Sequence, residues 1–246
     1  MSNQKIVLIS GETSTGKSYS LKSFKDDEGI LYLNCEGNKP LPFKAKFKSY
    51  AVTNPFQVYE AFVKAETPEM SHIHTIVVDT LSSLVRMFEY HFVHNSKDSR
   101  KAWGDYAAFV HDLIQHHVAK STKNVIIYAH LPPVAPDEER LPAEQRSSRG
   151  TVIKGAWNTQ GIESLFGLVI STKKVPVSIL EKYENPLLTI SPREKELGFK
   201  YVFQTQITKD TLNERMRGPD DLFSESEVFI NNDLKLLLDR IQEYYS

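Results

Sequence analysis

The chain has 246 residues, of which 40% are hydrophobic and 25% charged, the balance of an ordinary globular protein. A formal net charge of −1 excludes a surface that is basic throughout, although a local basic stripe stays open. No apolar run approaches the roughly 18 residues of a membrane span, and we expect no signal peptide. Cys35 is the only cysteine, so no internal disulfide can form. We therefore expect a cytoplasmic protein.

The strongest pattern lies in residues 5–21, KIVLISGETSTGKSYSL. A short apolar strand, Ile6–Ile9, leads into a loop that ends in a lysine, and we expect a helix over Gly16–Phe24. The loop completes the phosphate-binding pattern G-x-x-x-x-G-K-[ST] with Gly11, Gly16, Lys17 and Ser18. Glycines let successive backbone N–H groups point at one anion, and the helix adds the positive end of its dipole. The segment therefore predicts a triphosphate site.

Each residue type in this loop has an expected role. Lys17 would reach the β- and γ-phosphates as a point charge, and the Ser18 hydroxyl would hold Mg²⁺. The sequence thus predicts ATP and Mg²⁺ as ligands. The residues expected to line the nucleotide are Gly11, Glu12, Thr13, Ser14, Thr15, Gly16, Lys17, Ser18 and Tyr19.

A second strand is expected over Ile30–Leu33, and it delivers Glu36 to the edge of the sheet where the phosphate loop lies. Glu36 is either a general base that polarises the attacking water or a solvated loop carboxylate, and spacing alone leaves both open. Lys39–Tyr50 alternates lysines with aromatic residues. Such a segment could touch nucleic acid, but an amphipathic edge strand is favoured.

Two further buried strands end in polar residues. Thr75–Val78 ends at Asp79, and a carboxylate there is costly to bury unless it faces a cation. We therefore expect Asp79 to hold Mg²⁺, directly or through water. Asn124–His130 ends in a side chain that can donate a hydrogen bond, and His130 would lie beside the γ-phosphate.

The remaining elements follow from the periodicity of apolar residues and from the turn-forming residues that interrupt it. His111, His116 and His117 lie in an expected helix at spacings that do not bring all three onto one face, so surface or interface roles are favoured over metal binding. Expected helices are Phe56–Ala65, Leu84–Val93, Ala102–Val118, Trp157–Ser164 and a final helix capped by Asn232 and Asp233; expected strands are Leu165–Thr172, Val175–Tyr183 and Phe199–Ile207.

Two connections stand out. Asn95–Lys101 is a polar, basic loop, and Leu131–Gly150 is a long segment with several prolines and arginines. A connection of the second kind inside a domain is usually functional or disordered.

The order of these parts resembles the RecA-like recombinase ATPase core. The motifs that carry the resemblance are the phosphate loop GETSTGKS, the glutamate of LYLNCEG, the aspartate of TIVVDT and the polar strand end of IIYAH. More narrowly, AWGDYAAFVHDLI, FKYVFQTQI with the downstream MRGPDDLF, and INNDLKLLLDRIQEYY look like the short phage ATPases of the AAA domain group that includes the Sak-type single-strand annealing recombinases. The resemblance covers nearly the whole chain.

This resemblance implies an α/β fold: a RecA-like P-loop core with a mostly parallel sheet flanked by helices, and a β-rich C-terminal extension. The whole chain, 1–246, would be a single ATPase domain, with its core at about 1–172 and the extension and final helix at about 173–246. Strand 1 begins near residue 5, so the N-terminal segment by which filament-forming relatives clasp a neighbour is expected to be absent.

The resemblance also implies roles for residues. Glu36 would be the catalytic base, His130 would be the γ-phosphate sensor, and the loops 95–101 and 131–150 would face single-stranded DNA. Arg215 or Arg217 would act on the nucleotide of an adjacent subunit in a homo-oligomer.

The implied function is Mg²⁺-dependent ATP hydrolysis in DNA recombination or single-strand annealing, in a host cytoplasm if the protein is of phage origin. The alternative is a nucleotide-dependent assembly or regulatory module that hydrolyses ATP slowly and binds proteins rather than DNA. The low net charge favours this alternative, whereas the two candidate loops favour DNA.

Overall fold

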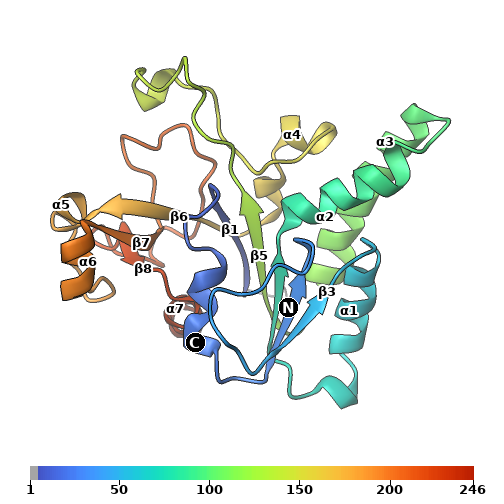
Figure 1. Ribbon diagram of the computed structural model, residues 1–246, viewed down its shortest axis with the longest axis horizontal. Coiled ribbons are helices and arrows are strands. Elements are labelled where there is room, and N and C mark those ends of the chain that lie inside the picture. The colour runs from blue at the N-terminus through green and yellow to red at the C-terminus, as the bar shows by residue number, and fades with distance from the viewer. Residues whose placement is uncertain (1–4) are drawn as a thin grey trace.

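The computed structural model describes residues 5–246, and a single eight-stranded sheet organises it (Figure 1). The strand order is β3-β2-β4-β5-β1-β6-β7-β8. The first six strands in this order, from β3 to β6, pair in parallel. β7 pairs antiparallel with β6, and β8 pairs antiparallel with β7. The bounds are β1 Ile6–Gly11, β2 Ile30–Asn34, β3 Lys48–Ala51, β4 Thr75–Asp79, β5 Asn124–His130, β6 Leu168–Pro176, β7 Phe199–Gln204 and β8 Phe229–Asn231.

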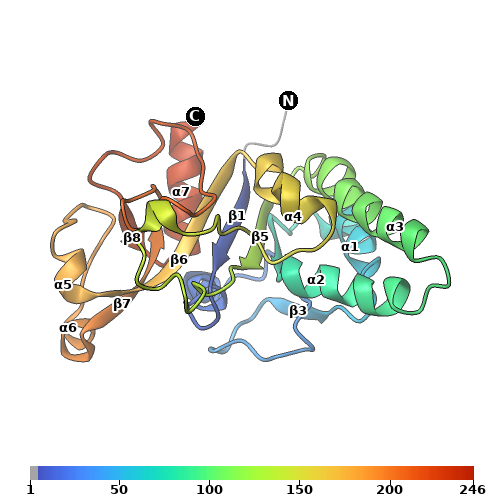
Figure 2. The same cartoon turned by 90° about the horizontal axis from the view of Figure 1, so that it is seen from above.

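Helices cover both faces of the sheet (Figure 2). The α-helices are α1 Gln57–Ala65, α2 Leu81–Phe88, α3 Ser99–Asp112, α4 Ala156–Gln160, α5 Val177–Leu180, α6 Pro192–Leu197 and α7 Leu234–Tyr244. Short 3₁₀ segments are η1 Ser18–Phe24, η2 Pro68–Met70, η5 Ala143–Gln145 and η6 Ile162–Leu165. Two π-helical turns, η3 Glu89–Val93 and η4 Leu113–Val118, continue α2 and α3.

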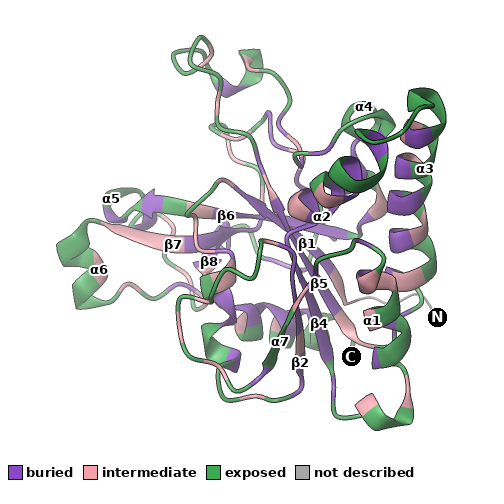
Figure 3. Ribbon diagram, turned by 45° about the vertical axis from the view of Figure 1, so that its right-hand side comes forward, coloured by how far each residue is buried: buried purple, intermediate pink, exposed green. Residues whose placement is uncertain are grey.

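The central strands are buried on both faces, because each sends alternate side chains into a different hydrophobic core (Figure 3). In β1, Leu8 packs with residues of α1, α2 and α3, whereas Val7 and Ile9 pack with residues of η1 and α7. β4 and β5 divide in the same way. The two layers therefore fix the strands, and through them the positions of the strand ends.

Most of the expected elements are present, and the strands β1, β2, β4 and β5 lie where the sequence predicts them. The segment after the phosphate loop is a 3₁₀ helix that begins at Ser18 rather than an α-helix from Gly16. Of the lysine-rich segment Lys39–Tyr50, only the end is regular, as the exposed edge strand β3. Ser99–Lys101, expected in a loop, forms the first turn of α3 because Asp98 caps that helix by accepting from the Lys101 N–H.

The expectation for the extension was wrong at one point. Leu165–Thr172 and Val175–Tyr183 are not two strands. β6 runs without a break to Pro176, and the next residues form α5. Pro176 explains the change, since its ring fixes φ at −57° and stands directly before the helix. Two further elements, α6 and the three-residue strand β8, were not expected, although Ser191 and Glu194 form a capping box at the start of α6 and Gly198 ends it.

The long connection 131–150 contains only the short helix η5 and extends beyond the edge of the sheet at which β5 ends (Figure 1). Its base is anchored by Arg149, which is 8% exposed and pairs with Glu12 of the phosphate loop and with Glu214. Within residues 5–246, no helix is both long and apolar enough to cross a membrane.

Candidate nucleotide-binding site

Four parallel strands end at one edge of the sheet and bring their polar residues together. β1 ends at Gly11, which lies opposite His130 at the end of β5. β2 ends at Asn34, which lies opposite Asp79 at the end of β4. A cavity of about 320 Å³ opens here, and its walls are Thr13, Ser14, Gly16, Lys17, Ser18, Tyr19, Tyr32, Asn34, Glu36, Lys39, Pro40, Pro42, Asp79, His130 and Tyr201. The carboxyl edge of a parallel sheet is the usual place for a ligand.

The two glycines of the loop are each required by what surrounds them. A Cβ at Gly11 would lie 2.0 Å from the Thr172 hydroxyl oxygen. Gly16 has φ of +95°, and a Cβ there would lie 2.6 Å from the side-chain nitrogen of Asn232. The loop can therefore curl tightly against β6 and β8 only with glycine at both positions.

Lys17 is buried at 7% exposure, and its ammonium group folds back onto its own loop. The Nζ donates to the carbonyl oxygens of Gly11 at 2.9 Å and Glu12 at 2.7 Å. Burial lowers the pKa of Lys17 to about 8, and the negative charges of Asp79 and Glu36 oppose that shift. Because neutral carbonyl oxygens are weaker acceptors than phosphate oxygens, the ammonium group of Lys17 is available to a phosphate.

Asp79 is 2% exposed, and its Oδ2 accepts hydrogen bonds from the Ser18 hydroxyl and the Tyr32 hydroxyl, each at 2.6 Å. Burial raises the pKa of Asp79, while the two hydrogen bonds oppose that rise. Within residues 5–246, no cationic group forms an ion pair with this carboxylate. A buried carboxylate beside a hydroxyl oxygen fits Mg²⁺, which prefers oxygen ligands and would compensate the charge.

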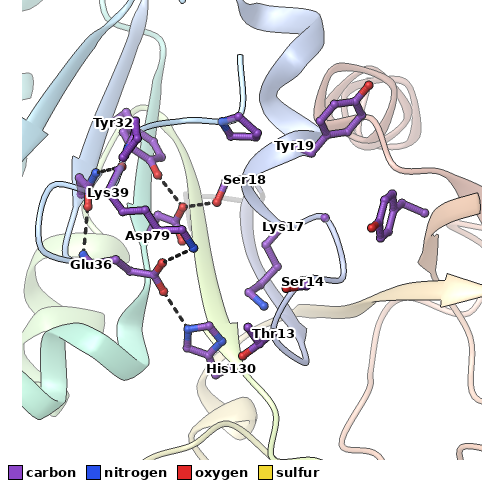
Figure 4. Close-up of a pocket in the computed structure, with 15 residues that line it drawn as sticks. Thr13, Ser14, Lys17, Ser18, Tyr19, Tyr32, Glu36, Lys39, Asp79 and His130 are labelled. Carbon is purple, nitrogen blue, oxygen red and sulfur yellow. Dashed lines mark hydrogen bonds and ion pairs between the residues drawn. The ribbon is translucent and has the colours of Figure 1, made fainter. Parts of the chain in front are cut away.

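Glu36 and His130 form a second pair on the wall that faces the phosphate loop (Figure 4). His130 Nε2 lies 2.8 Å from Glu36 Oε1, and Lys39 Nζ lies 3.6 Å from Glu36 Oε2. The hydrogen bond from His130 is the main cause that lowers the pKa of Glu36. The other ring nitrogen of His130, Nδ1, is buried and has no partner among the described residues. Glu36 is therefore an ionised carboxylate with one oxygen beside His130 and the other beside Lys39.

The structure brings most of the predicted site residues into one cavity. Thr13, Ser14, Gly16, Lys17, Ser18, Tyr19, Glu36, Asp79 and His130 all contribute to its walls. Gly11, Glu12 and Thr15 lie outside the lining and shape the loop instead. The Thr15 hydroxyl donates to the Glu12 carbonyl at 2.8 Å and lies 2.6 Å from the Thr172 hydroxyl.

The two arginines expected to act between subunits lie away from this cavity. Arg215 donates to the Ser148 hydroxyl at 3.1 Å and lies 3.6 Å from the Glu163 carboxylate. Arg217 is exposed, and its guanidinium donates to the Ser164 carbonyl at 3.4 Å. Neither side chain lines the cavity of its own chain.

Sequence reasoning missed several residues of the walls. Tyr32 reads as one member of a buried apolar strand, yet its hydroxyl reaches Asp79. Tyr201 is a wall residue from the C-terminal extension. Asn232, from the same extension, does not line the cavity but donates to the Gly16 carbonyl at 2.9 Å. Tyr32 had one local signal, a polar hydroxyl within an otherwise aliphatic run. Tyr201 and Asn232 had none, because long-range pairing alone brings them to the loop.

A family model described as an AAA domain matches residues 3–157, which is more than half of the chain. The chain belongs to the AAA domain family. The matched part of this AAA domain contains the phosphate loop, Glu36, Asp79 and His130, and it stops before β6. The expected α/β fold class, a P-loop core with a mostly parallel sheet flanked by helices, is confirmed, and the C-terminal extension adds the strands β7 and β8 to that sheet.

Two solved structures are similar to the AAA domain protein described here. The crystal structure of the RadB recombinase has 14% identity over 85% of this chain and 84% of its own, with a TM-score of 0.39. The flagellar accessory protein FlaH from Methanocaldococcus jannaschii has 13% identity over 83% of this chain and 78% of its own, with a TM-score of 0.36. A search of curated proteins found no match.

Proposed function

We propose that this protein binds ATP together with Mg²⁺ and hydrolyses the nucleotide by transferring the γ-phosphoryl group to water. The observation that carries this proposal is the arrangement of opposite walls around one cavity. Lys17 and Ser18 lie on the phosphate loop, and Asp79, Glu36 and His130 lie on the strand ends that face it (Figure 4). A cation, a metal-holding pair and a carboxylate base are the parts that phosphoryl transfer to water requires.

Binding would begin at the loop. Lys17 exchanges its contacts with the Gly11 and Glu12 carbonyls for oxygens of the β- and γ-phosphates, which are stronger acceptors. The Ser18 hydroxyl and the Asp79 carboxylate would hold Mg²⁺, which would neutralise phosphate charge. Tyr32 keeps its hydrogen bond to Asp79 and orients the carboxylate.

Glu36 would act as the general base. Its carboxylate is ionised, so it can accept a proton from the attacking water once it is free to approach. His130 now occupies that carboxylate at 2.8 Å. A γ-phosphate gives His130 another acceptor, so the same histidine that holds Glu36 would report the presence of the triphosphate.

We further propose that this activity supports DNA recombination or single-strand annealing, in a homo-oligomer in the cytoplasm, which would be a host cytoplasm if the gene is of phage origin. Residues 95–101 are all exposed, and Lys97, Arg100 and Lys101 lie among them. Segment 131–150 projects beyond the carboxyl end of β5, the edge of the sheet at which the cavity opens (Figure 1). Within this segment Arg140 is exposed and available to phosphates, whereas Arg146 donates to the Leu141 and Glu139 carbonyls and Arg149 is buried.

A second candidate is a nucleotide-dependent assembly or regulatory module that hydrolyses ATP slowly and binds proteins. The pairing of Glu36 with both His130 and Lys39 favours it, because a base that is already engaged is slow to act. The net charge of −1 favours it as well.

Lys17→Ala tests the nucleotide site. The substitution removes a charge whose only direct partners are loop carbonyls, so we expect a folded protein that no longer binds ATP productively. ATP affinity and turnover would be measured beside a circular dichroism spectrum. Lys64→Ala is the control, since that lysine is exposed on α1 and does not line the cavity. Unchanged ATP affinity and turnover in Lys17→Ala would contradict the assignment of the phosphate loop as the nucleotide site.

A salt series distinguishes DNA from protein as the partner. Binding of a single-stranded oligonucleotide would be measured with and without ATP at several salt concentrations. Neutralised phosphates leave a slope of about −0.7 per contact on a plot of log affinity against log salt. We expect such a slope, and we expect it to become shallower in Lys97→Ala, Arg100→Ala. The absence of ATP-dependent binding to DNA at low salt would favour the protein-binding module.

A further inference from the structure

The end of α3 carries a cluster of metal-ligating side chains that the nucleotide site does not use. His111, Asp112 and His116 each offer one ligand atom, and these three atoms lie within 4.8 Å of one another. His111 and His116 are exposed and Asp112 is half-buried, so an ion could reach the cluster from solvent.

The spacing of the ligand atoms is close to what a metal would impose. Asp112 Oδ1 lies 3.5 Å from His111 Nδ1 and 3.8 Å from His116 Nε2. A tetrahedral ion with bonds of about 2.0–2.2 Å holds its ligands roughly 3.3–3.5 Å apart. Small rotations of exposed side chains would therefore close the site, without any movement of the backbone.

The backbone explains why these residues meet. In an α-helix, residues five apart point about 140° away from one another. Residues Leu113–Val118 instead form the π-helical turn η4, in which the Ala119 N–H donates to the Ile114 carbonyl at 2.9 Å. The wider turn places the imidazole rings of His111 and His116 with their centroids 6.0 Å apart. π-turns of this kind are frequent at functional sites.

Packing on the opposite side holds the turn in this register. Leu113, Ile114 and Val118 are buried in the core that contains α1. His117 turns away from the cluster and stacks on Tyr59 with a centroid separation of 4.1 Å. The cluster therefore faces solvent on a helix whose inner face is fixed.

We propose that His111, Asp112 and His116 form a binding site for a first-row transition-metal dication, for which Zn²⁺ is the probe. Two imidazoles and one carboxylate suit Zn²⁺, Ni²⁺ or Cu²⁺, whereas Mg²⁺ and Ca²⁺ prefer oxygen ligands throughout. Three protein ligands leave at least one coordination position for water or for a group from another molecule. The site lies on the flank that carries α1 and α3, at the opposite end of the molecule from α5 and α6 (Figures 1 and 2).

Calorimetric titration with Zn²⁺ tests the proposal on the full chain without a polyhistidine tag. Excess Mg²⁺ is present so that Zn²⁺ does not enter the Asp79 site. We expect one Zn²⁺ to bind per chain, and we expect Zn²⁺ to raise the melting temperature. His111→Ala and His116→Ala should each weaken the affinity by at least about 10-fold, since even the loss of an outer-shell partner costs about 10–100-fold. All the variants concern exposed side chains, so circular dichroism should be unchanged.

Two control variants complete the test. His91→Ala removes an exposed histidine outside the cluster and should bind Zn²⁺ as the wild type does. Asp79→Asn should also leave this binding unchanged. The proposal is overturned if the wild type binds no Zn²⁺, if His111→Ala and His116→Ala bind it with wild-type affinity, or if binding disappears in Asp79→Asn.

Discussion

Glu36 illustrates how one carboxylate can be prepared for chemistry and held back at the same time. The hydrogen bond with His130 lowers its pKa, which keeps it ionised, and occupies the oxygen that a water molecule would need. The Asn34 side chain also accepts from the Glu36 N–H at 3.0 Å and so fixes the backbone at the end of β2. The position of Glu36 is thus set by the strand, whereas its availability depends on His130.

Glu36→Gln keeps the size of the side chain and removes the carboxylate that we propose as the general base. We expect ATP binding to be retained and turnover to fall by about 10²- to 10⁴-fold, the usual cost of losing a general base. Glu60→Gln, an exposed position on α1, is the matched control and should turn over ATP normally. If Glu36→Gln hydrolyses ATP at the wild-type rate, the base lies elsewhere.

The lowered pKa of Lys17 predicts how ATP affinity depends on pH. Below a pH of about 8 the buried ammonium is charged, and as the pH rises through that value the free protein loses this charge. ATP affinity should therefore fall above about pH 8, by up to about 10-fold per pH unit. A fluorescent ATP analogue titrated between about pH 7 and 9.5 would show it. In Lys17→Arg the guanidinium stays charged, so its weaker affinity should be flat, and a flat wild-type profile would contradict this assignment.

At the scale of residues, the sequence predicted those residues of the cavity wall that belong to local patterns in the chain. Lys17 and Ser18 follow from a contiguous motif, and Asp79 follows from a carboxylate at the end of a buried run. Asn232 could not be found in this way, because its contact with Gly16 joins positions 216 residues apart. Contacts between residues far apart in the chain depend on the order of the strands in the sheet, and no local sequence pattern predicts them.

At the scale of elements, the sequence again predicts what local patterns determine and misses the rest. The strands β1, β2, β4 and β5 are buried runs that period and composition identify, and they were predicted closely. The π-turn η4 was not, because an apolar periodicity of 3.6 cannot show where a helix widens locally. Val177–Leu180 was expected as a strand for a similar reason, since a short apolar run fits either period and the preceding Pro176 decides between them.

Asp233 joins the last helix to the element that follows the phosphate loop. Its Oδ1 accepts from the N–H groups of Lys235 and Leu236, which caps α7, and from the Ser23 hydroxyl of η1 at 2.6 Å. Asp233→Ala should lower the free energy of unfolding by about 0.5–2 kcal/mol, the range for losing such a cap. Urea denaturation measures this, with Asp239→Ala, an exposed position on the same helix, as the control. Equal effects of the two substitutions would contradict the capping role.

At the scale of the whole molecule, the C-terminal extension packs against the phosphate loop of the candidate nucleotide site. β7 and β8 continue the sheet beyond β6 and bring Tyr201 and Asn232 against Gly16, where a Cβ would meet both. The matched AAA domain ends at residue 157, so these contacts come from outside it. The loop that binds phosphate is therefore shaped by both parts of the chain.

The positions of Arg215 and Arg217 bear on assembly. Neither lines the cavity of its own chain, and Arg215 is held beside Glu163. Any action of these arginines on a γ-phosphate would therefore have to occur in a neighbouring subunit. A cation supplied from outside stabilises charge on the transferring phosphoryl group, which is worth about 10³- to 10⁵-fold in other enzymes. Both arginines could instead be surface residues that stabilise their own chain.

Mixing of inactive subunits distinguishes these roles. We expect Arg215→Ala, Arg217→Ala to lose most of its turnover while its own phosphate loop stays intact. Lys17→Ala is inactive in its own site but still carries both arginines, so adding it should restore turnover to the double variant. The measurement is ATPase activity across a concentration series of the mixture, with each variant alone as the control. If no mixture recovers activity, and if the specific activity of the wild type does not change with protein concentration, then each subunit works alone and the shared site is wrong.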